Sequence, residues 1–373
     1  MKYAGWMIGV CAVCLIPLTA SAQSVYEELQ DMVRAEVVAI TNEREEAIPG
    51  TGATSTVQTV SARIEEGEHE HEIVTFENDL IPLAAGDDIF LSHIRTIEGD
   101  EFYILKDVNR GTELLFLTIC FVALLLLFAG WQGLRSLGSL VLSIGAILFL
   151  LIPALLAGYD PILVSLMIAS VILAIALFGT HGINPRSIVA FAGTLSAVIV
   201  TSVFAWIFVG AMRLTGFGSD AAVSLNFATG GSLDFAGLLL GSIIIGILGI
   251  LDDVSITQAS VVAELKRANE SFGLGELYHR AIRVGRDHVG SLVNTLALAY
   301  VGAALPLVLL FATSHAPIMF SLNQEVIAAE LARIIIGSIG IILAVPATTL
   351  VAAWWFSRYG IAHDSGHMHH HHH

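Results

Sequence analysis

The chain has 373 residues, of which 55% are hydrophobic and only 13% are Asp, Glu, Lys or Arg, and its formal net charge is −16 at pH 7. Because soluble globular proteins carry about 25% charged residues, this composition excludes an ordinary soluble protein over the whole length. The acidic character also excludes a basic surface for nucleic acid, and we expect no nucleic-acid partner.

The N-terminus has the pattern of a secretory signal. Lys2 precedes an apolar stretch over residues 4–18, and Ala20-Ser21-Ala22 has the small-x-small form of a cleavage site. We therefore expect residues 1–22 to be a signal peptide. An uncleaved signal anchor is the alternative, and both place the next segment outside the cytoplasm.

Residues 23–110 predict an extracytoplasmic acidic domain of β structure. They hold 20 Asp and Glu against six Lys and Arg, a net charge of about −14. Hydrophobic and polar residues alternate in short runs separated by turn sequences at 65–68 and 85–88. We expect strands around 33–37, 56–60, 73–76, 89–91 and 102–105. About five short strands indicate a small β-barrel or sandwich.

The run Glu68-His69-Glu70-His71-Glu72 is the one metal-like pattern in this domain. If it lies on a strand, His69 and His71 share one face. Two imidazoles with a carboxylate from a neighbouring strand are ligands that suit a divalent metal ion such as Zn²⁺. The alternative is a solvated hairpin in an acidic domain, with no cofactor at all.

Residues 111–358 predict a transmembrane domain of seven helices. A helix needs about 20 apolar residues to cross a bilayer. The segments that meet this condition are 114–130, 137–157, 162–178, 188–212, 235–251, 289–311 and 327–355. The chain is therefore expected to be a multi-pass protein of a bacterial cell membrane, with the lipid bilayer as its main partner and a homo-oligomer as an open possibility.

Basic residues in the loops give the expected orientation. With the N-terminal domain outside, only Arg213 falls in an outer loop. Eight fall in inner loops or after the last span: Arg135, Arg186, Lys266, Arg267, Arg280, Arg283, Arg286 and Arg358. Seven spans then place the C-terminus in the cytoplasm. The His-rich tail within residues 359–373 is either a purification tag or a native metal-binding segment.

Polar residues cluster at the cytoplasmic ends of the fifth and sixth expected spans. Such residues in membrane helices are costly and indicate substrate or proton pathways. If the fifth helix continues past Leu251, Asp253 and Thr257 share one face, with Asp252 and Gln258 beside them. The stripe on the sixth helix consists of Asp287, His288, Ser291, Asn294 and Thr295. The two stripes can form one polar pocket if they face each other.

Two simpler explanations apply to the charged residues of this region. Asp252 and Asp253 can reach interfacial water or pair with Arg283 and Arg286 as a topology anchor. In the last span, Glu330 and Arg333 lie three residues apart near the outer end of the helix, so either snorkelling to the interface or mutual pairing is expected.

Several stretches resemble the YibE/F-like membrane protein family, in the wording of its actinobacterial branch. They read Gly249–Ser260 (GILDDVSITQAS), Gly285–His288 (GRDH), Asn294–Ala303 (NTLALAYVGA) and Val345–Thr348 (VPAT). The resemblance implies a multi-spanning protein with an extracytoplasmic β domain. It brings no settled activity, and the His-rich tail is not part of its pattern.

The leading functional hypothesis is a secondary transporter or exporter of a small ion or solute, coupled to protons through the carboxylates of the fifth and sixth helices. The absence of a Walker motif argues against ATP-driven transport by this chain alone. A receptor or scaffold with a cation-binding outer domain is the alternative. An intramembrane enzyme is less favoured, because no nucleophile elbow or His-x-x-x-His pair occurs in the spans, and we assign no catalytic residue.

Overall fold

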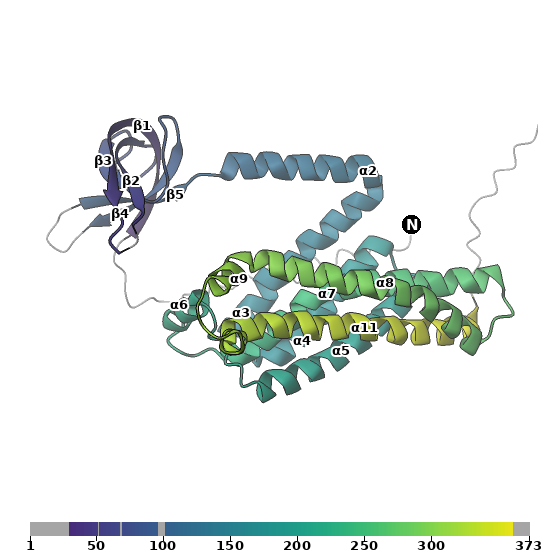
Figure 1. Ribbon diagram of the computed structural model, residues 1–373. Helices are drawn as coiled ribbons and strands as arrows, with labels where there is room; N and C mark the ends of the chain where they lie inside the picture. Colours follow the sequence, from purple (N-terminus) through teal and green to yellow (C-terminus); the bar gives the residue numbers. More distant parts are fainter. Residues whose placement is uncertain (1–29, 51, 68, 96–100, 361–373) are drawn as a thin grey trace, which may run out of the picture. The chain divides into compact units, whose positions relative to one another are not determined.

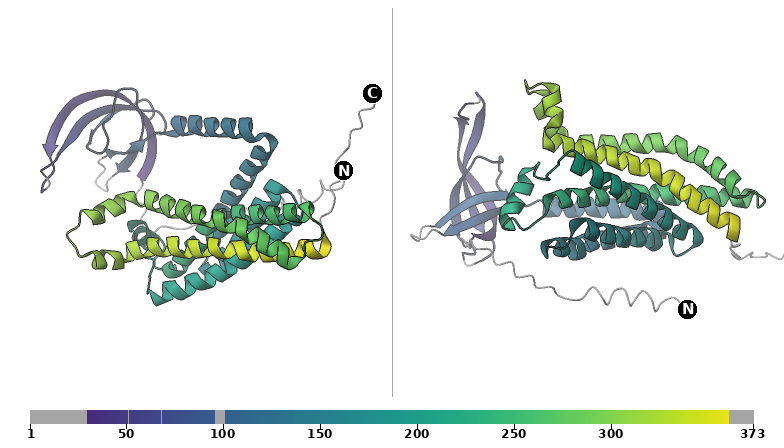
Figure 2. Two further views of the ribbon diagram at one scale, coloured as in Figure 1. Left: turned by 45° about the vertical axis from the view of Figure 1, so that its right-hand side comes forward. Right: turned by 90° about the horizontal axis from the view of Figure 1, so that it is seen from below.

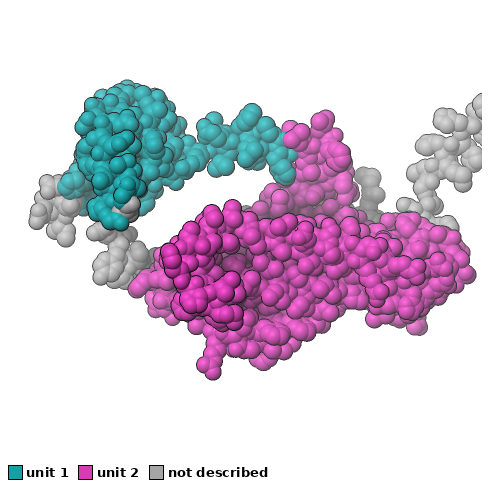
Figure 3. Space-filling view, in the orientation of Figure 1, with its two compact units in different colours: residues 1–121 teal, residues 122–373 magenta. Residues whose placement is uncertain are grey.

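The computed structural model describes residues 30–50, 52–67, 69–95 and 101–360 (Figure 1). The expected signal peptide and most of the His-rich tail lie outside these residues. The described chain forms two compact units that divide between Phe121 and Val122 (Figure 3). We describe each unit by itself.

The first unit contains one antiparallel sheet of five strands: β1 (Gln30–Ala47), β2 (Thr54–Ile64), β3 (Ile73–Asn78), β4 (Asp88–Arg95) and β5 (Glu101–Val108). Their order in the sheet is β3-β2-β1-β4-β5. The return of β4 to the free side of β1 is a Greek-key arrangement. The strands expected from the alternating sequence are therefore confirmed, and each one is longer than its sequence pattern indicated.

The sheet curls into a partly open barrel, which Figure 2 shows from two further directions. Two register irregularities in β1, near Val37 and Ile40, allow this long strand to bend and pair with both β2 and β4. The edge strands β3 and β5 come into contact. A groove of about 480 Å³ is lined by residues of these two strands. The alternating inward side chains, such as Val60, Ile64 and Leu91, fill the interior.

The first helical segment is longer than any single span requires. Helix α2 (Gly111–Ala146) continues through η2 (Ile147–Leu151) into α3 (Ile152–Leu156). Together these 46 residues measure about 69 Å at the usual helical rise, whereas the hydrocarbon core of a bilayer is about 30 Å thick. Gly130 interrupts the helix with φ 52° and ψ −133°, a conformation that glycine adopts without a steric penalty.

The remaining helices form the rest of the second unit. They are α4 (Pro161–Ala174), η3 (Ile175–Gly179), α5 (Pro185–Ala211), α6 (Asp220–Ala228), α7 (Phe235–Ala268), α8 (Leu274–Ala303), α9 (Leu305–Ala312), α10 (Ile318–Asn323) and α11 (Glu325–Tyr359). Asp160, Asn184 and Asp234 cap the first turns of α4, α5 and α7 through their side-chain oxygens.

Five of the described helical segments are long and apolar enough to cross a membrane, or six if α8 and α9, which meet at a 71° bend, make one span. The multi-pass character expected from the sequence is therefore supported, but the count of seven is not reached. The difference arises at residues 131–136, which the sequence pattern places in a loop. In the structure these residues are helical, so the first two expected spans run together.

Helices α5, α7 and α11 pack closely and form the centre of this unit, with α8 against α7 and α11. Small residues allow the backbones to approach. A Cβ atom on Gly193 of α5 would lie 2.6 Å from the Cα atom of Thr348 in α11, and one on Gly337 would lie 2.9 Å from Leu296 in α8. Glycine at such crossings is typical of helices that associate in membranes.

Candidate functional site

Helix α7 continues well past Leu251, as the predicted polar stripe requires. The residues of this stripe differ in their exposure to solvent. Asp253 and Thr257 are exposed, Asp252 is half-buried and Gln258 is buried. At the helical rise, Asp252 and Asp253 lie about 26 Å from the start of α7, which is close to the thickness of a bilayer core.

The predicted polar residues of α8 are brought to the surface of the chain. Asp287, His288, Ser291, Asn294 and Thr295 are all exposed, while Ala281, Gly285 and Leu296 are buried. Among the described residues, no hydrogen bond or ion pair joins this stripe to Asp253 or Thr257. The formation of one polar pocket by the two stripes therefore stays a prediction. Helix α8 packs through Leu277, Ala281, Gly285 and Leu296, and the two small residues among them permit a close approach of the backbones.

The buried polar contacts of the bundle centre on Gln258. Its Nε2 atom donates hydrogen bonds to the carbonyl oxygen of Ala281 in α8, at 2.9 Å, and to Oγ1 of Thr349 in α11, at 2.7 Å. One turn away, Thr348 Oγ1 donates to Ser255 Oγ at 3.0 Å. These contacts join α7, α8 and α11 through buried side chains. The sequence indicated Gln258, but Ser255, Thr348 and Thr349 were not among the predicted site residues.

The carboxylates of Asp252 and Asp253 have no ion pair with Arg283 or Arg286 in the part of the chain that the structure describes. A topology anchor built from these four residues is therefore not formed. Asp252 Oδ1 accepts a hydrogen bond from the backbone nitrogen of Asp253. Two adjacent acidic groups thus lie on α7 and make no ion pair within the described residues.

His181, which follows η3, is a neighbour that the sequence pattern did not reveal. Burial lowers its pKa from the ordinary value, and the nearby Asp253 carboxylate acts in the opposite direction. This histidine and this carboxylate come from segments about 70 residues apart. No sequence spacing connects His181 with Asp253, so their proximity can be recognised only from the folded structure.

Glu330 and Arg333 of α11 form an ion pair, one of the two arrangements expected from the sequence, and both side chains are half-buried. The Arg333 guanidinium also donates to Ser242 Oγ of α7 at 3.5 Å. The hydroxyl of Tyr300 in α8 packs closely against Gly246 of α7. It lies 2.8 Å from the position that a Cβ atom on this glycine would take. The pair is therefore part of a second polar contact between α7 and α11.

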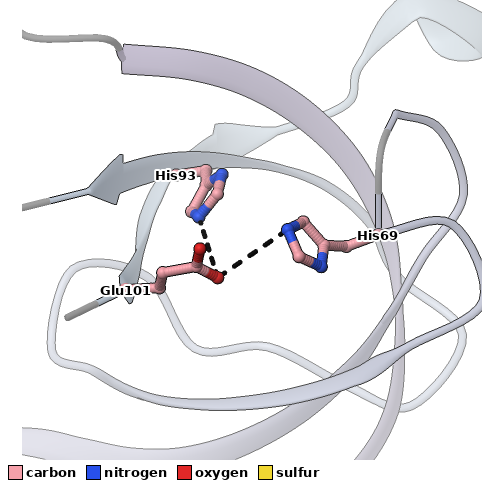
Figure 4. Close-up of side chains that lie close together, drawn as sticks. All are labelled: His69, His93 and Glu101. Carbon is pink, nitrogen blue, oxygen red and sulfur yellow. Dashed lines mark ion pairs between the residues drawn. The ribbon is translucent and has the colours of Figure 1, made fainter. Parts of the chain in front are cut away.

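In the β domain, the run that carries His69 and His71 does not lie on a strand, so the condition for the predicted metal pair is not met. Residues 69–71 form a turn, and His71 has a φ of 75° with its side chain 81% exposed. The two imidazoles therefore do not share a face. His69 instead approaches His93 of β4 and Glu101 of β5 (Figure 4). Their nitrogen and oxygen ligand atoms lie within 4.8 Å of one another.

His93 and Glu101 were missed because they lie just beyond the strand segments that the sequence pattern outlined. In the actual register, His93 pairs with Tyr103 and Arg95 pairs with Glu101 across β4 and β5. Knowledge of this register would have placed both residues at one end of the barrel, beside the turn that carries His69.

A family model described as YibE/F-like protein matches residues 117–358, which is well over half of the chain. No curated protein and no solved structure matches the sequence.

Proposed function

The chain belongs to the YibE/F-like family, and on that premise we propose that it is a secondary transporter of a small ion or solute in the cell membrane, coupled to protons. The observation that carries the proposal is the pair of adjacent carboxylates, Asp252 and Asp253, which lie on helix α7 and make no ion pair within the described residues. Ionisable groups in membrane helices are expensive and are retained where they serve ion or proton pathways.

The neighbourhood of these carboxylates supports a proton-coupled role. Asp253 is close enough to act on the pKa of His181, and imidazole is the side chain that most readily exchanges protons near neutral pH. Asp287 and His288 of α8 supply a second such pair in the same cytoplasmic half of the helices. We place the proton path along these groups.

The exposed polar stripe of α8 also fits a transport path. Ser291, Asn294 and Thr295 lie on a helix whose opposite face packs into the bundle. Within a membrane such side chains require contact with water or another protein group. We propose that they line the water-accessible wall of the path.

We propose seven membrane crossings for the same chain, because the 46 residues from Gly111 to Leu156 are about twice as long as one crossing needs and are interrupted at Gly130. Two crossings in this segment place the β domain outside and most loop arginines inside, as the charge rule requires. One crossing would place both on the same side of the membrane.

Charge favours cations among the candidate solutes. The segment 23–110 has a net charge of about −14, which concentrates cations at its surface. Asp160 and Asp234 line a hollow of about 350 Å³ at the N-terminal ends of α4 and α7. With the β domain outside, this hollow opens on the same side as that domain and would be the outer mouth of the path.

Uptake into vesicles of phosphatidylethanolamine and phosphatidylglycerol tests the proposal. The purified chain is reconstituted, and entry of Zn²⁺, Mn²⁺ and Mg²⁺ is followed with entrapped dyes. We expect at least one cation to enter faster than in protein-free vesicles. Joint replacement Asp252→Asn and Asp253→Asn should abolish the difference, whereas Glu264→Gln, on the exposed end of α7, should not. Equal entry with the wild type and the double variant would refute the role of these carboxylates.

A further inference from the structure

The barrel of the β domain holds a group of side chains that the transport proposal does not use. His69 Nε2 lies 3.7 Å and His93 Nε2 lies 3.5 Å from the same atom, Oε2 of Glu101 (Figure 4). Neither imidazole nitrogen has a hydrogen-bond partner in the described structure, although both atoms are buried. Two buried polar atoms without a partner are unfavourable, so a third species between them would satisfy both.

Neighbouring side chains leave one nitrogen of His69 and one oxygen of Glu101 available as metal ligands. His69 Nδ1 lies 3.1 Å from Glu72 Oε2, which leaves Nε2 as the free nitrogen of that ring. Arg95 donates to Oε1 of Glu101 at 2.7 Å, which leaves Oε2 free. A carboxylate behind a histidine ligand is the usual support of a protein metal site, since it fixes the ring tautomer and orientation.

His93 is held more rigidly than its two neighbours. Its ring stacks on Tyr103, with centroids 4.7 Å apart and an angle of 6° between the planes, and its side chain is only 10% exposed. His69 meets the same ring edge-on at 5.4 Å. The ligand group is therefore built from a turn and two adjacent strands rather than from one mobile loop.

The separations suit a small divalent ion. Ligands at about 2.0–2.2 Å from a tetrahedral Zn²⁺ lie about 3.4 Å from each other, close to the two separations of 3.5 and 3.7 Å. Imidazole nitrogen favours zinc and other transition metals, whereas Ca²⁺ and Mg²⁺ prefer oxygen ligands throughout.

We propose that His69, His93 and Glu101 form a binding site for one divalent transition-metal ion, with Zn²⁺ as the best-matched occupant. Three protein ligands leave a coordination position open. Glu101 and Tyr103 also line the groove between β3 and β5, so the ion can enter and exchange from that groove. The site lies in the β domain and does not depend on the transport proposal.

Metal binding by the purified protein in detergent, with its C-terminal histidines removed, provides the test. His367 and His369–His373 would themselves bind metal, so every protein ends after Ser365. We expect equilibrium dialysis to give one Zn²⁺ per chain. Co²⁺ in place of Zn²⁺ should give the visible absorption of a four-coordinate site with nitrogen and oxygen ligands.

Variants then locate the site. Glu101→Gln and His69→Ala should each weaken Zn²⁺ binding by at least about tenfold. His71→Ala is the matched control, because this histidine is exposed, and it should leave the affinity unchanged. His93→Ala is less informative, since this buried ring also supports the barrel.

Two results would overturn the proposal. One is a wild-type chain that retains no Zn²⁺ after dialysis, an outcome that does not depend on the folding of any variant. The other is an equal loss of affinity in His71→Ala and His69→Ala, which would indicate chelation by the exposed acidic turn instead of the buried group.

Discussion

The side-chain amide of Gln258 in α7 donates a hydrogen bond to the hydroxyl oxygen of Thr349 in α11 across 2.7 Å, and both side chains are buried. The same amide also reaches the backbone of α8. One residue thus connects three helices of the bundle.

Replacement of Gln258 by Leu should destabilise the bundle by about 1 kcal/mol, because hydrogen bonds between membrane helices contribute about that much. Thr257→Leu, one position along on an exposed face, should change stability far less. Unfolding of both variants in mixed SDS and detergent micelles measures the difference. Equal stability of the two variants would show that the Gln258 contacts contribute nothing.

Replacement of Gly193 by Ala should also destabilise the bundle, by about 1–3 kcal/mol, because the added methyl group would overpack a closed interface. Its Cβ atom would lie 2.8 Å from Cβ of Thr348. Gly210→Ala, in the same helix but with nothing within 4 Å of the added atom, should be neutral or stabilising. The melting temperatures of the two purified variants test this prediction. A higher melting temperature for Gly193→Ala than for Gly210→Ala would contradict the close α5–α11 contact.

Cysteine labelling in intact cells should place the β domain outside. In a chain whose three native cysteines are replaced by Ser, Asn42→Cys in β1 and Ser314→Cys after α9 should react with an impermeant maleimide. Ser271→Cys, between α7 and α8, should react only after permeabilisation; all three positions are exposed. If Asn42→Cys is protected like Ser271→Cys, the segment 111–156 crosses the membrane once and the seven-span arrangement is wrong.

The pKa of His181 should fall further in Asp253→Asn, because the carboxylate opposes the effect of burial. A histidine whose pKa is lowered in the folded state destabilises the fold as pH falls from its ordinary pKa toward the lowered one. Below the ordinary pKa of histidine, the neutral fraction of His181, and so its reaction rate with diethylpyrocarbonate, should be higher in the variant than in the wild type. Peptide mapping by mass spectrometry follows this residue alone, with Asp287→Asn as the control. An unchanged rate would show that Asp253 does not act on His181.

The sequence was informative where one local pattern determines the structure. Alternation located the strands of the barrel, and apolar length located the helices. The same approach failed at Gly130, because a glycine that bends a helix and a glycine that ends one leave the same sequence signal. The family suggested by residues such as Asp252-Asp253-Val254 is confirmed by the match over residues 117–358.

Side-chain partners were less predictable than elements. The i and i+4 spacing of Asp253 and Thr257 was correct, but periodicity does not say which face of α8 meets α7, and the small residues Ala281 and Gly285 decided it. The pairing of Glu330 with Arg333 was predictable because it is local. His69, His93 and Glu101 come together only through strand register, which no short-range pattern contains.

Proton movement coupled to cation uptake is the most direct test of the transport account. The wild-type chain in vesicles that hold a pH-sensitive dye is given whichever of Zn²⁺, Mn²⁺ or Mg²⁺ it takes up, and the internal pH is recorded. We predict that protons leave as the cation enters and that Asp253→Asn abolishes this exchange while Glu264→Gln preserves it. Proton movement in Asp253→Asn equal to that of the wild type would contradict the account.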